Sequence, residues 1–383
     1  MDALFIQYIL MLQNKIYRNF IIEIFKTFII ILFGLSLIAL TVRSVSFLDL
    51  IVDSGYPVVT YFKYSLLNLF GIAPKFVPLA FLISLTIFIL RHIQDSEFVI
   101  LWTSGIKKIS VVNLFLFTSI IVLSIYLLLS TIITPYALNK SRQLLSNDKF
   151  NSFLPTIKKQ QFSDSFKGFT FIVEKKFSNE LQNIFLHDKG NNLKNLSSNI
   201  SETSSTTIIA ESGIIDIKKM ILFNGQIISS KKNKENEIVK FEQLNIDLSD
   251  LATTTIKAPK IQETSTIKLL SCFSKKFGSD QICNEDIKKE ILPTLNRRFI
   301  IPFYIPVISL ICSLLLIKSE KKLFHKISIF SYSFLLLVFT ELAVRYSGIN
   351  NLIMFFFIIF PFVLLLFLYS FLIYKFSKES IVK

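Results

Sequence analysis

The chain has few charged residues for its length. Only 18% of its 383 residues are Asp, Glu, Lys or Arg, whereas about a quarter are charged in an average soluble protein. Hydrophobic residues make up 52%, and 40 residues are Phe. The apolar residues gather in long runs towards both ends, and the middle resembles an ordinary soluble sequence. This distribution excludes a purely soluble protein and predicts membrane spans on either side of a folded domain.

The motifs for nucleotide hydrolysis and metal binding are missing. No GxxxxGK[ST] phosphate-binding loop occurs, so we do not expect the chain itself to hydrolyse ATP. No HExxH occurs, and His92, His187 and His325 are far apart, which argues against a metal site of His and Cys. Asp95 follows His92 by three residues, which is not the HxxxxD spacing of an acyltransferase. We expect all three His to be exposed surface or loop residues, and we expect no cofactor.

Cysteine is also scarce. Three cysteines, Cys272, Cys283 and Cys312, are too few for a disulfide scaffold. Cys272 and Cys283 fall in the segment that we place outside the cytoplasm, where a disulfide between them is permitted, and the sequence is equally compatible with two unpaired thiols. Cys312 lies in an apolar run, and we expect it to be a packing residue.

Six apolar runs are long enough to cross a bilayer, which takes about 20 residues. They are Phe25–Val42, Val77–Leu90 (preceded by Leu66–Ala73), Ile109–Ile133, Phe299–Ile317, Ile327–Val344 and Leu352–Tyr374. Pro74 and Pro78 are expected to bend or start the second helix, and Pro135 to stop the third. No small-residue cleavage site follows the first run, so we expect a retained span and not a cleaved signal peptide. The fold class is thus a polytopic α-helical membrane protein with an inserted domain, divided into residues 1–135, 136–296 and 297–383.

Part of the net charge of +15 lies in short segments next to the spans. Basic residues precede span one, follow span six, and lie between spans two and three and between spans four and five. These residues are Lys15, Arg18, Arg91, Lys107, Lys108, Lys318, Lys321, Lys322, Lys326, Lys375, Lys378 and Lys383. Short loops on the cytoplasmic side are rich in Lys and Arg, so this side is predicted to be cytoplasmic and residues 136–296 to lie outside.

The inserted segment is predicted to be rich in β-structure. Its candidate strands are short and mix aromatic with β-branched residues: Lys167–Lys175, Leu181–Leu186, Thr206–Ala210, Gly213–Ile217 and Phe241–Leu248. Asn224-Gly225 between two apolar triplets is the strongest short signal for a hairpin turn. Many short strands favour a sandwich or jelly roll, with a mixed α+β domain as the alternative. Lys268–Phe273 and Asn284–Ile291 are expected to be short helices that lead back to the membrane.

The loop between spans two and three predicts a short amphipathic helix within residues 92–106. Ser96 is placed to cap it, and Glu97 lies in its first turn, next to the positive end of the helix dipole. Gly105 is expected to end it. Three apolar side chains share one face at helical spacing: Phe98, Leu101 and Trp102. The helix could lie in the membrane interface with Trp102 at the headgroups, or it could dock a cytoplasmic partner.

Several stretches carry a resemblance to a known family. They are Arg18–Lys26 (RNFIIEIFK), Pro78-Leu-Ala80, Asp95-Ser-Glu97 followed by Ser104-Gly-Ile106, Pro135, Ile209–Gly213 (IAESG) and Leu222–Gly225 (LFNG). In these stretches and in its layout of three spans, a domain and three spans, the whole chain resembles the lipopolysaccharide-export permeases LptF and LptG. The β domain is slightly closer to LptF. Trp102 and the Lys107-Lys108 pair depart from the looser family pattern.

The resemblance implies a permease subunit of an ABC transporter in the bacterial inner membrane, with a jelly-roll-like domain in the periplasm and no enzymatic activity. It implies a heterodimer with a second permease of the family, a cytoplasmic dimer of the ATPase LptB, the single-span LptC, the periplasmic bridge LptA, and lipopolysaccharide as substrate. The helix of the loop between spans two and three would enter a groove of the ATPase. Carried onto this chain, its docking residues are Glu97, Phe98, Leu101, Trp102 and Gly105.

The substrate path implied by the resemblance needs cations near the outer ends of the spans, because the lipid carries phosphates. Arg43, Lys63 and Lys75 are the candidates, although charges at the ends of spans also extend simply to the headgroups. Glu341 and Arg345 are four residues apart and could pair on one helix face. We interpret such a pair as structural or inter-subunit and not as catalytic.

Two other functions compete with lipid export. One is an ABC permease that acts mechanically on a periplasmic partner and has no lipid cavity. The other is a membrane enzyme of envelope lipids, which would need a cluster of acid, base or nucleophilic residues that the sequence does not offer.

Overall fold

Six helices in the described part of the chain are long and apolar enough to cross a membrane, which confirms the predicted fold class. They cover Lys15–Phe47, Val58–Gln94, Lys108–Leu145, Glu290–Leu316, Leu323–Tyr346 and Met354–Lys378. The computed structural model describes residues 15–48, 51, 57–156, 160–166, 169–177, 180–189, 203–215, 219–231, 236–247, 260–272, 285–317, 322–347 and 351–381.

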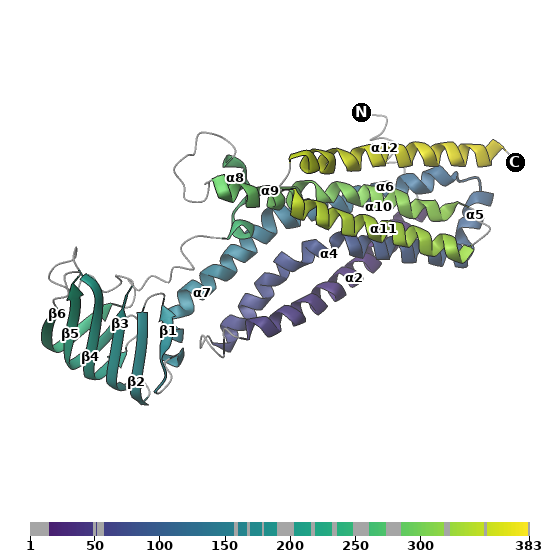
Figure 1. Ribbon diagram of the computed structural model, residues 1–383. Helices are drawn as coiled ribbons and strands as arrows, with labels where there is room; N and C mark the ends of the chain where they lie inside the picture. Colours follow the sequence, from purple (N-terminus) through teal and green to yellow (C-terminus); the bar gives the residue numbers. More distant parts are fainter. Residues whose placement is uncertain are drawn as a thin grey trace. The chain divides into compact units, whose positions relative to one another are not determined.

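The chain divides into two compact units, one of residues 1–41, 68–139 and 260–383 and one of residues 42–67 and 140–259. The first, the membrane unit, holds most of the six long helices (Figure 1). The helices are α2 (Lys15–Phe47), α4 (Val58–Gln94), α5 (Glu97–Thr103), α6 (Lys108–Leu128), α7 (Thr134–Thr156), α8 (Thr266–Ser271), α9 (Glu285–Phe299), α10 (Tyr304–Ser313), α11 (Lys322–Tyr346) and α12 (Asn351–Ile381).

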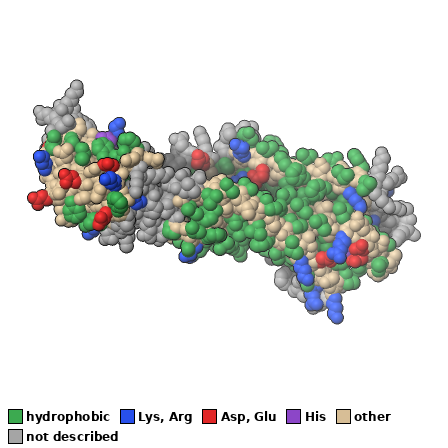
Figure 2. Space-filling model, turned by 90° about the horizontal axis from the view of Figure 1, so that it is seen from below, with side chains coloured by type: hydrophobic (Ala, Val, Ile, Leu, Met, Phe, Trp, Pro, Cys, Tyr) green, Lys and Arg blue, Asp and Glu red, His purple; other side chains and the backbone are tan. Residues whose placement is uncertain are grey.

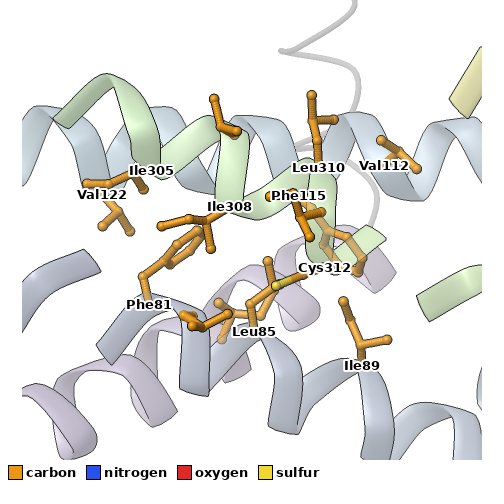
Figure 3. Close-up of a cluster of buried hydrophobic side chains, with 14 of the residues drawn as sticks. Phe81, Leu85, Ile89, Val112, Phe115, Val122, Ile305, Ile308, Leu310 and Cys312 are labelled. Atoms are coloured by element: carbon orange, nitrogen blue, oxygen red, sulfur yellow. The ribbon is translucent and has the colours of Figure 1, made fainter. Parts of the chain in front are cut away.

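The core of the membrane unit forms around α10, all ten residues of which are buried. Its side chains meet those of α4 and α6 in one apolar cluster (Figure 3). Members of this cluster include Phe81, Leu85 and Ile89 from α4, Val112, Phe115 and Val122 from α6, and Ile305, Ile308, Leu310 and Cys312 from α10. In contrast, α2, α11 and α12 leave many large apolar side chains exposed, and one face of the molecule shows a broad hydrophobic surface (Figure 2). Such exposure is expected where lipid or a neighbouring helix replaces water.

Prolines inside the spans leave carbonyl groups without their helical partner, and side chains of other helices bind two of these groups. Proline has no N–H, so the carbonyl four residues earlier loses its hydrogen bond. Pro74 frees the carbonyl of Phe70, which accepts from Thr134 Oγ1 at 2.7 Å. Pro361 frees that of Phe357, which accepts from the Tyr304 hydroxyl at 3.1 Å.

The third proline, Pro135, does not stop its helix, so that prediction is wrong. The helix continues from α6 through a π-helical segment, Leu129–Ile133, into α7. The freed carbonyl of Thr131 accepts from Thr266 Oγ1 at 2.7 Å, so a third hydroxyl takes the place of the missing N–H. Pro74 and Pro78 likewise lie inside α4 and do not start it, since that helix begins at Val58.

The inserted segment forms one antiparallel sheet of six strands, which confirms the β-rich domain. The strands follow one another in chain order: β1 (Ser163–Phe166), β2 (Phe169–Phe177), β3 (Glu180–Asp188), β4 (Thr203–Ile215), β5 (Lys219–Lys231) and β6 (Asn236–Asp247). Each described strand therefore pairs with its neighbours in sequence, without the crossover of a Greek key. A buried cluster that includes Phe171, Leu186, Ile208 and Leu222 covers one face.

The predicted hairpin turn at Asn224-Gly225 is wrong, because both residues lie inside β5, where Phe223 pairs with Gln243 and Gly225 with Phe241. Asn224 has the left-handed φ of 48° that Asn tolerates better than most residues. A Cβ atom on Gly225 would collide with the carbonyl oxygen of Ile209 and come within 2.5 Å of Phe241 Cζ. The pair thus marks an irregularity and a close approach inside a strand.

The same irregularity crosses the sheet as a row of exposed polar residues: Glu174, Asn183, Glu211, Asn224 and Glu242. They fall opposite one another at the gaps in the strand pairing. Asn183 also has a left-handed φ, of 51°. Both Leu181 and Ile184 are buried although they are three positions apart in the strand, so the row shifts the alternation of buried and exposed side chains by one residue.

Replacement of Gly225 by Ala should destabilise the sheet by about 2 kcal/mol or more, because β4 and β6 leave no room for a methyl group. We expect protease cleavage within the strands of the full-length, detergent-solubilised protein to begin at a lower temperature. Gly34→Ala is the control, since a Cβ there meets nothing within 4 Å. Unchanged cleavage in Gly225→Ala would mean that the strands can separate enough to accept the methyl group.

Tyr304→Phe should lower the thermal stability of the solubilised protein, because a buried carbonyl without a donor costs about 1–3 kcal/mol. Pro361→Ala restores an N–H that can donate to the same carbonyl of Phe357. The shift in melting temperature caused by Tyr304→Phe should therefore be smaller in the Pro361→Ala background. Equal shifts in both backgrounds would contradict the link between the proline and the hydroxyl.

Candidate functional site

The predicted amphipathic helix is present as α5, between α4 and α6. Ser96 precedes it, but its side chain caps no backbone N–H, contrary to the prediction. Its φ of 59° is left-handed, whereas a capping Ser needs extended backbone to reach the third residue of the helix. The chain uses this left-handed residue to turn from α4 into α5.

Gly105 ends α5 as predicted. It has φ of 92°, its N–H donates to the carbonyl of Trp102 at 3.2 Å, and the N–H of Ile106 donates to that of Leu101 at 3.1 Å. These two bonds form a Schellman motif, which satisfies the last carbonyls of the helix and needs a left-handed residue at this position. A Cβ on Gly105 would meet nothing within 4 Å, so backbone conformation alone explains the glycine.

Three of the five predicted docking residues pack against the bundle and not on the exposed side of α5. Phe98 and Leu101 are buried in the core of the membrane unit, and Trp102 packs against it, stacked on Phe98. These side chains attach the helix to the bundle. The apolar side chains that α5 exposes are Val99, at 52%, and Ile100, at 64%. The sequence carried a signal for this second face, since residues 98–102 are five consecutive apolar residues.

Lys108 also contacts the helix. Its Nζ lies 4.6 Å from the centre of the Trp102 ring and 5.5 Å from that of Phe376 in α12. A cation over an aromatic face is a favourable contact. The Lys after Gly105 that departs from the family pattern therefore connects α5 with the last span.

Glu97, at the start of α5, faces His92 in the last turns of α4. His92 Nε2 lies 3.1 Å from one carboxylate oxygen of Glu97 and 3.6 Å from one of Glu23 in α2. His92 Nδ1 lies 2.9 Å from the carbonyl oxygen of Phe88. The side chain of His92 is only 4% exposed, whereas that of Glu97 is 49% exposed. The expectation that His92 is an exposed residue is therefore wrong.

Aromatic rings enclose the imidazole of His92. The ring centres of Phe20, Phe88 and Phe98 lie 5.0, 4.0 and 5.6 Å from that of His92. These rings come from α2, α4 and α5, so the histidine lies where three helices meet. This environment excludes water from the ring and leaves its two nitrogens to the groups that face them.

The other two His are not exposed either. His187 is partly buried beside Thr207, with Nδ1 2.9 Å from Oγ1, and Nε2 of the partly buried His325 lies 3.2 Å from the carbonyl of Leu314. No group of three His, Cys, Asp or Glu that could hold a metal occurs among the described residues.

Of the three candidate lipid contacts, Arg43 and Lys63 belong to the second unit and Lys75 to the membrane unit, and all three are exposed. The ends of α2 and α4 pack together next to Arg43: the Tyr61 hydroxyl donates to the carbonyl of Ser44 at 3.0 Å, and Phe47 and Tyr64 are in ring contact at 4.9 Å. Arg43 thus lies beside two helix ends that are in contact, and a role in lipid binding stays a prediction for all three.

Glu341 does not pair with Arg345 but with Arg297 of α9, at 2.6 Å. The neighbouring Arg298 is buried and donates to Thr266 Oγ1 and to the carbonyls of Gln262 and Thr264. The contacts of Arg297 join α9 to α11, and those of Arg298 join α9 to α8 and to the segment before it. The sequence missed this role of Arg298, because its partners lie more than 30 residues away.

Two of the three cysteines can be compared with the sequence analysis. Cys312 is free and buried, as expected of a packing residue. Cys272 is disulfide-bonded. Cys283 lies outside the described residues, so its pairing with Cys272 stays a prediction.

A comparison with protein-family models matches residues 18–375 to the family described as lipopolysaccharide export system permease LptF/LptG. The match includes Glu23, His92, α5 and the whole sheet, and it does not distinguish LptF from LptG. No curated protein matches the sequence.

Proposed function

The chain belongs to the lipopolysaccharide export permease family LptF/LptG, and we propose that it is the membrane subunit through which a separate ATPase drives lipid export. The observation that carries this proposal is α5. This helix joins the second and third spans, is anchored by Phe98 and Leu101, and presents Glu97, Val99 and Ile100 on its exposed side. A helix held rigidly by one face and free on the other suits the transfer of a partner's movement to the spans.

The ATPase, which we assign to LptB, would cover the exposed apolar side of α5. Two large apolar side chains next to a carboxylate fit an apolar groove with a cation at its edge. This end of the bundle would be cytoplasmic, in agreement with the excess of Lys and Arg in its short loops. The sheet would then lie in the periplasm.

The lipid would enter between this chain and a second permease of the family. The exposed apolar faces of α2, α11 and α12 supply surface for acyl chains and for the partner, and Arg43 and Lys63 would meet the phosphates. The sheet would pass the lipid, through its exposed strand edges, to LptC and the bridge LptA, because edge strands accept further strands.

Val99→Asp combined with Ile100→Asp should reduce co-purification of the ATPase at least about tenfold, because charges would enter an apolar interface. Ile238→Asp with Val239→Asp is the matched control: the same residue types, exposed by 59% and 48%, on β6. Glu97→Ala should weaken the same association. If the Val99 and Ile100 double variant retains the ATPase at the wild-type yield, α5 is not the docking helix.

A photo-reactive side chain at position 43 should form adducts with lipopolysaccharide in cells, since Arg43 is exposed near the proposed lipid path. The same probe at Lys375, at the far end of α12, should not. Adducts at neither position would favour the competing function, a permease that acts mechanically and has no lipid cavity.

A further inference from the structure

Lys108, the first residue of α6, contacts aromatic rings of two other helices. Its Nζ is 4.6 Å from the centre of the Trp102 ring in α5 and 5.5 Å from that of Phe376 in α12. Figure 1 shows α5 at the end of the membrane unit where α12 ends. An ammonium group over an aromatic ring is attracted by the negative charge density of the ring face. One cation therefore joins parts of α5, α6 and α12.

This contact is a second attachment of α5 to the bundle. The first attachment is Phe98, whose ring centre lies 6.2 Å from that of Phe20 in α2 and 6.4 Å from that of Phe88 in α4. Trp102 stacks on Phe98, and through Lys108 it reaches the last span. The indole N–H of Trp102 is buried and has no hydrogen-bond partner among the described residues. Contacts of the ring itself therefore hold Trp102 in place.

The last span is also bound to α6 at a second level. The hydroxyl of Tyr369, about two turns before Phe376, donates to Asn113 Oδ1 at 3.2 Å. Leu372 lies between these two contacts on α12 and is fully buried. Tyr374, in contrast, is 65% exposed, so α12 packs on the bundle with one side and presents another. A displacement of this end of α6 would therefore move α12 and its exposed apolar surface.

We propose that Lys108 is a positioning residue that couples the docking helix to the last span. When the ATPase moves α5, Trp102 displaces Lys108, and Phe376 follows with α12. The exposed side of α12 then shifts, and this is part of the surface that would meet acyl chains or the second permease. The inference rests on the proposed docking of an ATPase to α5, and it adds which span receives the movement.

The contact can be measured without the ATPase, because Trp102 is the only tryptophan of the chain. Fluorotryptophan in the full-length, detergent-solubilised protein therefore gives a single ¹⁹F signal. We expect Lys108→Met to shift this signal, since it removes the cation from the ring, and Lys108→Arg to keep it close to the wild-type position. Lys107→Met is the matched control, because Lys107 is the preceding residue and is exposed. An unchanged signal in Lys108→Met would overturn the proposal.

The coupling is measured in the complex with the ATPase, with a nitroxide label on α12. The label is attached in Tyr374→Cys, at an exposed position, and the same labelling reaction on the chain without this substitution gives the background. We expect ATP to change the mobility of the nitroxide. Lys108→Met and Phe376→Leu should lose most of this change while the ATPase co-purifies at the wild-type yield, and Lys108→Arg should retain it.

Four outcomes would contradict the coupling role. ATP could leave the label on α12 unchanged although the ATPase is bound, or Lys108→Met could retain the full response. Lys107→Met could lose the response as well, which would assign the effect to charge near α5 and not to the ring contact. Finally, Lys108→Met could lose the ATPase itself, which would make Lys108 a docking residue. The docking function fails separately, when the Val99 and Ile100 double variant binds the ATPase normally.

Discussion

Every backbone carbonyl inside a bilayer needs a hydrogen-bond donor, because no water is present to supply one. This constraint determines how the membrane unit is held together. At three of the prolines within its helices, a hydroxyl from a distant segment reaches the freed carbonyl: Thr134 at Phe70, Thr266 at Thr131, and Tyr304 at Phe357. A residue that weakens one helix thereby creates a bond between two parts of the chain. Apolar contacts alone discriminate weakly between neighbouring spans in a bilayer, and these hydrogen bonds give the spans specific partners.

The helix α5 is also held by a few specific contacts. The buried face of α5 packs into the apolar core, and its exposed face carries Val99 and Ile100. At its start, the carboxylate of Glu97 lies next to the ring of His92. The helix is too short to be stable alone, so its conformation depends on Phe98, Leu101 and the Schellman motif at Gly105. A partner that pulls on such a helix pulls on the spans as well.

The sequence predicts those features that depend on neighbouring residues. The six spans follow from long apolar runs, and Gly105 ends α5 because a helix end is a local structure. The failures occur where distant residues decide. No residue near His92 in the sequence indicates that Phe20, more than 70 residues earlier, packs against its ring. Likewise, Glu341 pairs with Arg297 and not with Arg345, which is nearer in sequence.

Asn224-Gly225 fails for a different reason. The residue types do indicate a left-handed backbone conformation at Asn224 next to a glycine, but this conformation occurs both in turns and in irregular strands. Only the strands on either side, β4 and β6, decide between them. In the same way, the sequence predicted the helix α5 but not which of its faces is buried, because apolar residues occur on both of its faces.

The order of the strands affects how the protein is made. Every described strand pairs with the strand before or after it in the chain, so none of the described pairings must wait for a distant segment. Short loops close quickly, and local pairings fold faster than distant ones. The sheet can therefore be completed during synthesis, before the last three spans have left the ribosome. The membrane unit must wait, because α10 at its centre comes from the C-terminal part of the chain.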